Sequence, residues 1–76
     1  MKMEEQILNI INKIRTSKEM PSLPCLHEDD HLREKLGLTS FDLAELTVCI
    51  EDEFDIDIFE DGLVNTVGEI YAKLSK

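Results

Sequence analysis

Residues 37–46 read GLTSFDLAEL, and this stretch decides the fold because it marks the entrance to a helix. Thr39 suits the N-cap position, since Asp42 then falls three residues on, where its carboxylate can complete a capping box. The positions on either side of the cap then hold the two apolar residues of a hydrophobic staple, Leu38 and Leu43. The pattern therefore predicts that Thr39 caps the helix and that Ser40 is its first residue.

The helix that follows is expected to run to about Phe54 and to have two unlike faces. At about 100° per residue, one side collects the core residues Leu43, Leu46, Thr47, Ile50 and Phe54. The opposite side collects Phe41, Ala44, Glu45, Val48 and Asp52, with Asp42 at its margin. The outward face is thus predicted to be a small apolar patch framed by acids.

The acidic charge of the chain is unevenly placed. The net charge is −9, and residues 36–72 hold ten acids but no Lys or Arg. Several of these acids crowd the end of the predicted helix, where each opposes the helix dipole at a cost of about 0.3–1 kcal/mol. Stability alone would not favour that placement, whereas recognition by basic protein surfaces would. The same field argues against nucleic acid and anionic membranes as partners.

Two further helices flank this one. Residues 3–15 carry apolar residues at helical spacing, with acids in the first turn and with Lys13 and Arg15 in the last. Thr66 and Glu69 predict a capping box that opens the last helix, whose apolar stripe comprises Val67, Ile70, Tyr71 and Leu74.

The connections complete the predicted architecture. Residues 16–38 form a long loop that contains Pro21 and Pro24, with a short helical turn expected over residues 30–36 and ended by Gly37. A short helix is expected over residues 59–64. Three apolar residues of the segment EFDIDIF are expected to plug the bundle end: Phe54, Ile56 and Ile58. The sequence therefore predicts a single all-α domain over residues 1–76, a small four-helix bundle of three main helices plus one short helix.

Other patterns in the sequence indicate no membrane span, metal site or catalytic group. No run of apolar residues is long enough for a membrane span, and acids at the N-terminus stand where a signal peptide would be basic, so a cytoplasmic monomer is expected. Cys25, His27 and His31 lack a fourth metal ligand, and the acids after Asp57 fail the EF-hand pattern. Cys25 and Cys49 are expected to be free thiols. No nucleophile–base arrangement is evident, so we do not expect an enzyme.

Residues 30–54, DHLREKLGLTSFDLAELTVCIEDEF, resemble the centre of an acyl carrier protein. In that family a Leu-Gly pair, a short turn and a serine open the second helix of a four-helix bundle, and an acidic run and a Phe close it. The matching positions are Leu36, Gly37, Ser40, Glu45, Leu46 and residues 51–54. The family usually has Asp-Ser-Leu where this chain has Thr39-Ser40-Phe41, which suggests a specialised member.

The resemblance implies that Ser40 receives 4′-phosphopantetheine from coenzyme A through a separate phosphopantetheinyl transferase. The arm would carry acyl groups as thioesters and present them to enzymes of fatty-acid or secondary-metabolite synthesis. The partner-docking residues would be Phe41, Asp42, Ala44, Glu45, Val48 and Asp52. Wheel position suggests Leu46, Ile50 and Ile70 as lining of an acyl pocket. The alternative is an unmodified acidic helical interaction module, in which Ser40 only belongs to the cap.

Overall fold

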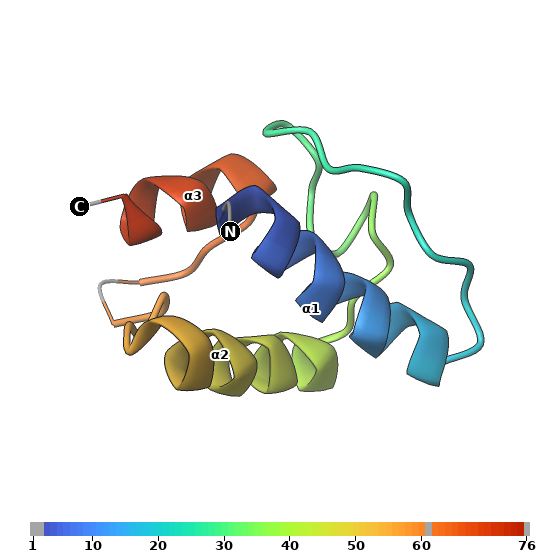
Figure 1. Ribbon diagram of the computed structural model, residues 1–76, viewed down its shortest axis with the longest axis horizontal. Helices are drawn as coiled ribbons and strands as arrows, with labels where there is room; N and C mark the ends of the chain where they lie inside the picture. The colour runs from blue at the N-terminus through green and yellow to red at the C-terminus, as the bar shows by residue number, and fades with distance from the viewer. Residues whose placement is uncertain (1–2, 61, 76) are drawn as a thin grey trace.

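Three helices form the computed structural model, which describes residues 3–60 and 62–75 (Figure 1). They are α1 (Met3–Ser17), α2 (Ser40–Phe54) and α3 (Val67–Leu74). Within the described residues the only β-type pairing is an isolated bridge between His31 and Thr66. The prediction of an all-α chain is confirmed. None of the helices in the described ranges combines the length and hydropathy needed to cross a membrane.

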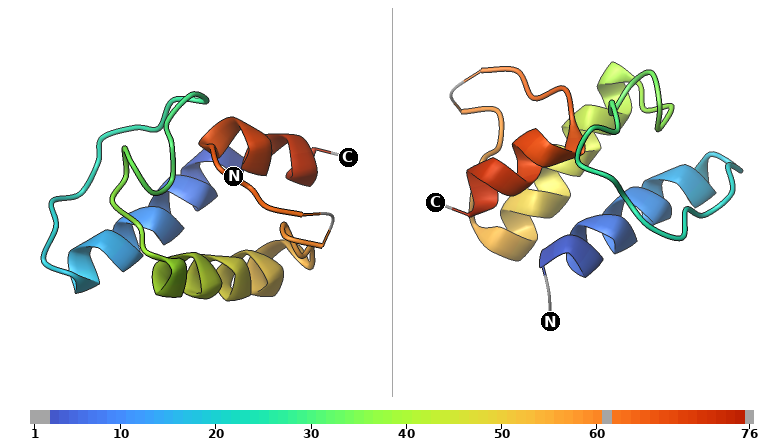
Figure 2. Two further views of the ribbon diagram at one scale, coloured as in Figure 1. Left: turned by 180° about the vertical axis from the view of Figure 1, so that it is seen from behind. Right: turned by 90° about the horizontal axis from the view of Figure 1, so that it is seen from above.

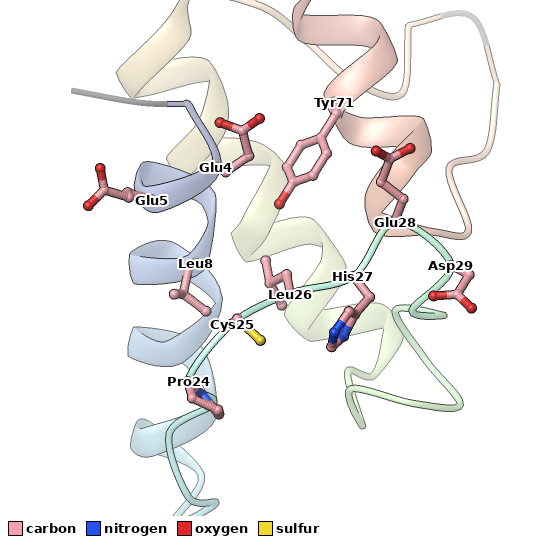
Figure 3. Close-up of a pocket in the computed structure, with 10 residues that line it drawn as sticks. All are labelled: Glu4, Glu5, Leu8, Pro24, Cys25, Leu26, His27, Glu28, Asp29 and Tyr71. Atoms are coloured by element: carbon pink, nitrogen blue, oxygen red, sulfur yellow. The ribbon is translucent and has the colours of Figure 1, made fainter.

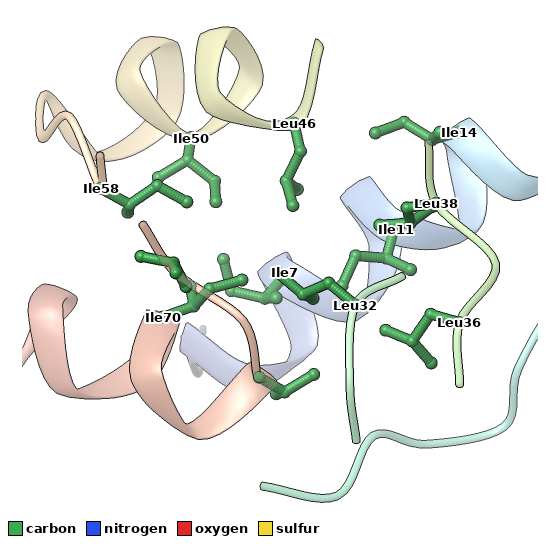
Figure 4. Packing of buried hydrophobic residues seen from close by; sticks show 12 residues of the cluster. Ile7, Ile11, Ile14, Leu32, Leu36, Leu38, Leu46, Ile50, Ile58 and Ile70 are labelled. Carbon is green, nitrogen blue, oxygen red and sulfur yellow. The ribbon is translucent and has the colours of Figure 1, made fainter. Parts of the chain in front are cut away.

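The helices meet around an aliphatic core. Helix α1 packs against α2. The long connection between these two helices covers the side of α1 that faces away from α2 (Figure 2). Fully buried side chains converge from all three helices and from the connection (Figure 4): Ile7, Ile11, Ile14, Leu32, Leu36, Leu38, Leu46, Ile50 and Ile70. Each such side chain contributes about 1.5–3 kcal/mol by leaving water. Ile58, from the predicted plug, is also fully buried, while Phe54 and Ile56 are half-buried.

The fourth, short helix expected over residues 59–64 is not confirmed, because no described residue of that segment is helical. Residues 58–60 form a turn, in which the Asp57 side chain accepts a hydrogen bond from the Phe59 N–H at 2.9 Å, and residues 63–64 are irregular. Gly62 has a φ of 134°, which no helix allows. An Asp side chain that bonds nearby backbone competes with helix formation. The predicted helical turn over residues 30–36 is likewise a single turn, and Gly37 ends it with a φ of 75°.

Hydrogen bonds fasten the connection between α1 and α2 to the helices. The Asn12 side chain pairs with the Leu23 backbone in both directions, at 2.9 and 2.7 Å. Farther on, the Gly68 N–H donates to the Glu28 carbonyl at 2.9 Å and the Val67 N–H donates to the Asp30 carbonyl at 3.0 Å. Because the first N–H groups of a helix have no partner within it, this loop serves as part of the cap of α3.

Candidate cofactor-attachment site

The N-terminus of α2 is closed by the predicted capping box. Thr39 has extended backbone angles, and its Oγ1 accepts a hydrogen bond from the Asp42 N–H at 3.1 Å. In return, Asp42 Oδ2 accepts a hydrogen bond from the Thr39 N–H at 2.9 Å. The helix therefore begins at Ser40, and this prediction is confirmed. Leu38 is buried and Leu43 packs partly buried against the core, as a staple would require.

Ser40 has no part in this cap. Its side chain is exposed, and its hydroxyl has no hydrogen-bond partner among the described residues. The same holds for its own N–H group and that of Phe41, since the first backbone bond of the helix runs from the Leu43 N–H to the Thr39 carbonyl at 2.9 Å. An exposed hydroxyl beside two unpaired N–H groups at the positive end of a 15-residue helix is suited to bear a phosphate.

Asp42 lies differently from the other residues predicted to dock partners. Only 5% of its surface is exposed, and its Oδ2 accepts a hydrogen bond from Lys18 Nζ. Burial alone would raise the pKa of Asp42, but the hydrogen bonds from Lys18 and Thr39 outweigh it and hold the pKa below its usual value. The cap and the ion pair thus occupy the carboxylate of Asp42 and withdraw it from the exposed face, and its part in docking stays a prediction.

Two cations at the end of α1 hold the turn before Ser40, and sequence reasoning missed this role. Lys18 Nζ also donates to the Gly37 carbonyl at 2.9 Å. Arg15 is buried and donates to the carbonyls of Pro21, at 3.2 Å, and of Leu36. The sequence indicates that Arg15 suits the helix dipole, but no local pattern shows which carbonyls these side chains reach.

The remaining residues of the outward face are on the surface. Phe41 is 80% exposed and Val48 is 62% exposed, which is unusual for large apolar side chains. Ala44, Glu45 and Asp52 are exposed as well. The structure thus gathers an exposed patch of two large apolar residues and two acids along α2, next to Ser40.

The three residues suggested for an acyl pocket lie together in the core. Leu46, Ile50 and Ile70 are each 0% exposed, and Figure 4 shows them pointing toward the space between α2 and α3. None of them lines the groove of about 770 Å³ on the surface, which lies between α1, residues 24–29 and Tyr71 of α3 (Figure 3). Among residues 3–60 and 62–75, no group of His, Cys, Asp or Glu is placed to hold a metal ion.

Comparison with known proteins agrees with this geometry. The model of the family described as the phosphopantetheine attachment site matches residues 6–74. None of the curated proteins matches the chain, and none of the solved structures does. The family match spans nearly all of the 76 residues and includes α2, α3 and most of α1. The chain therefore belongs to the phosphopantetheine attachment-site family, as a carrier of the acyl-carrier-protein type that holds 4′-phosphopantetheine covalently.

Proposed function

We propose that this protein carries acyl groups as thioesters on a 4′-phosphopantetheine arm attached to Ser40. The observation that supports this assignment is that the cap at the start of α2 does not use the Ser40 hydroxyl. Thr39 and Asp42 satisfy the cap between them, so the exposed Ser40 hydroxyl is left without a structural partner. The arm supplies the terminal thiol, and the chain supplies the point of attachment and the surface that partners recognise.

The surroundings of Ser40 favour the phosphodiester that attachment creates. In the transfer, the Ser40 oxygen forms the new P–O bond to the phosphate of the pantetheine arm, the P–O bond of the pyrophosphate linkage of coenzyme A breaks, and adenosine 3′,5′-bisphosphate leaves. The proton passes to a base of the transferase, since no described side chain is bonded to this hydroxyl. The N–H groups of Ser40 and Phe41 then face the anion. Lys18 offsets the charge of Asp42, so the nearest buried carboxylate repels the phosphate less.

The outward face of α2 is proposed as the surface that docks partner enzymes, including the transferase. Glu45 and Asp52 would meet basic side chains, and Phe41 and Val48 would fill apolar depressions between them. Apolar anchors surrounded by charges are typical of specific interfaces. The acyl chain would be sheltered among Leu46, Ile50 and Ile70, which requires α2 and α3 to separate slightly. Phe41 and Thr39 in place of the residues usual in the family support a specialised carrier.

Mass spectrometry tests the attachment. The unmodified chain is incubated with coenzyme A and a broad-specificity phosphopantetheinyl transferase, and intact masses are compared with those of two variants. We expect one phosphopantetheinyl group on the native chain and on Ser22→Ala, a change at an exposed serine of the loop. We expect none on Ser40→Ala. Modification of Ser40→Ala would refute the assignment, and no modification under several transferases would support the unmodified interaction module.

Transfer kinetics test the docking face separately. Each exposed ion pair contributes about 0.2–1 kcal/mol, so the loss of two such pairs should lower kcat/KM by about twofold to thirtyfold at low salt. The test variant is Glu45→Lys with Asp52→Lys. The control reverses two exposed acids elsewhere, Glu19→Lys with Glu34→Lys, and so has the same net charge. Equal losses in both variants would show that only the overall charge matters.

A further inference from the structure

A second surface feature lies away from α2 and is independent of Ser40. It is a groove of about 770 Å³ formed by the N-terminal half of α1, residues 24–29 and α3 (Figure 3). Its lining residues are Glu4, Glu5, Leu8, Pro24, Cys25, Leu26, His27, Glu28, Asp29 and Tyr71. None of them belongs to α2, whose ribbon lies behind the groove in Figure 3. A partner in this groove would leave the outward face of α2 accessible.

The floor of the groove is apolar. Leu26 and Tyr71 pack partly buried against the core, and Leu8 is half-buried beside them. Pro24 contributes an exposed ring at one end. Tyr71 presents its ring between α1 and the loop, with its hydroxyl directed into the groove (Figure 3). Such a floor would bury the apolar side chains of a ligand. The volume of the groove is within the range of about 300–1,000 Å³ that is usual for binding sites.

The rim of the groove is acidic. Glu4, Glu5, Glu28 and Asp29 are all exposed, and within the described chain none of them forms a salt bridge. No Lys or Arg is among the lining residues. Burial raises the pKa of Tyr71, and the negative charges of Glu4, Glu28 and Asp30 raise it further. The phenol therefore stays protonated at neutral pH and can donate a hydrogen bond, while the groove as a whole attracts cations.

The loop that carries half of this rim is held in place. The Gly68 N–H donates to the Glu28 carbonyl at 2.9 Å, and Asp30 Oδ2 accepts a hydrogen bond from the His27 N–H at 2.9 Å. A β-carbon at position 68 would lie only 3.0 Å from that same carbonyl, so loop and helix are in close contact. Because the backbone is fixed, a ligand would not have to order it on binding.

We propose that this groove is a second docking surface, which binds a basic amphipathic segment of a partner protein. Lys or Arg side chains of the segment lie against Glu4 and Glu28, and an apolar side chain between them lies on Tyr71 and Leu26. Charge complementarity selects the occupant: the carboxylates of Glu4 and Glu28 lie on either side of Tyr71 (Figure 3) and form no salt bridge within the described residues, so they match a segment in which basic and apolar residues alternate. The net charge of −9 opposes binding of nucleic acid or an anionic membrane at the same place.

Two synthetic peptides of equal length and charge test the proposal on the full, unmodified chain. One alternates Lys with Leu, and the other alternates Lys with Gly. Amide chemical shifts of the ¹⁵N-labelled protein are followed during titration at low salt. We expect the Lys/Leu peptide to shift signals from residues 4–8, 24–29 and 71, and to bind at least tenfold more tightly than the Lys/Gly peptide. Shifts confined to α2, or equal affinities of the two peptides, would overturn the proposal.

Matched variants separate the groove from the overall charge. Glu4→Gln with Glu28→Gln removes two rim charges, and Glu45→Gln with Asp52→Asn removes two from α2, so both variants have the same net charge. The groove variant should bind the Lys/Leu peptide about fivefold to tenfold more weakly, as expected for the loss of two exposed pairs. The α2 variant should change its affinity less than about twofold, within the spread of a screened charge effect. Equal losses in the two variants would refute a specific groove.

Cys25 offers an independent block of the groove, because its exposed thiol is among the lining residues. In a Cys49→Ala background, whose fold is checked by circular dichroism, Cys25 is alkylated with a bulky maleimide. We expect the Lys/Leu peptide to lose its affinity, and undiminished binding to the alkylated protein would contradict the proposal. None of these experiments involves modification of Ser40, so their failure would leave the carrier assignment untouched.

Discussion

The ion pair between Lys18 and Asp42 is expected to stabilise the start of α2. Its side chains are 29% and 8% exposed, which places the pair between surface and interior. Exposed pairs contribute about 0.2–1 kcal/mol and hydrogen bonds to charged groups about 1.5–3 kcal/mol. We therefore expect a coupling energy of about 1–2 kcal/mol from a double-mutant cycle of Lys18→Met and Asp42→Asn. Asp42→Asn alone should cost about 2 kcal/mol, because the charged acceptor of the Thr39 N–H is weakened as well.

Urea unfolding followed by far-ultraviolet circular dichroism measures these energies. A slope of about 1 kcal/mol per molar urea, usual for a small domain, converts 2 kcal/mol into a midpoint lower by about 2 M. Glu34→Gln is the matched control. The Glu34 side chain is 86% exposed, and its contact with His31 is long, at 3.9 Å, so it should contribute little to stability. Its free energy of unfolding should change by less than about 0.5 kcal/mol. A coupling energy below about 0.3 kcal/mol for Lys18 and Asp42 would refute the reasoning.

The pH dependence provides a second check on the same pair. The folded protein holds the pKa of Asp42 below its ordinary value of 3.8. The stabilisation is therefore complete above that value and is lost as the pH falls through the lower, folded pKa. The gap in stability between the native chain and Asp42→Asn should be full at pH 7 and should shrink toward pH 2. A gap that stays constant over this range would show that Asp42 acts through its shape and not its charge.

Three further changes address other parts of the fold. Arg15→Met should destabilise by about 2 kcal/mol in urea unfolding, because the buried carbonyl of Leu36 loses its charged donor. Asp55→Gly should stabilise by about 1 kcal/mol in the same assay, because Asp55 ends α2 with a left-handed φ of 59°. Gly68→Ala should lower the melting temperature by several degrees, since its β-carbon would meet the Glu28 carbonyl at 3.0 Å; an unchanged melting temperature would show that the loop yields freely.

Comparison of predicted and observed elements shows where local sequence is sufficient. The capping boxes at Thr39 and Thr66 were predictable, since each depends on two residues three positions apart. The faces of α2 were predictable too, because helical spacing fixes which side chains share a side. In contrast, the helix expected over residues 59–64 depended on a weak apolar pattern. The hydrogen bond from the Phe59 N–H to the Asp57 side chain and the positive φ of Gly62 favour a non-helical backbone there.

The sequence by itself determined where α2 begins, that Ser40 stands outside its cap, and which residues of α2 face outward. These features follow from bonds and spacings within a few residues. Only the tertiary structure decided that Asp42 is buried, because its partner Lys18 lies 24 positions away along the chain. The acidic groove is also tertiary, since it brings together residues from α1, the long connection and α3. Contacts between distant segments depend on how the helices pack, and no local pattern encodes that packing.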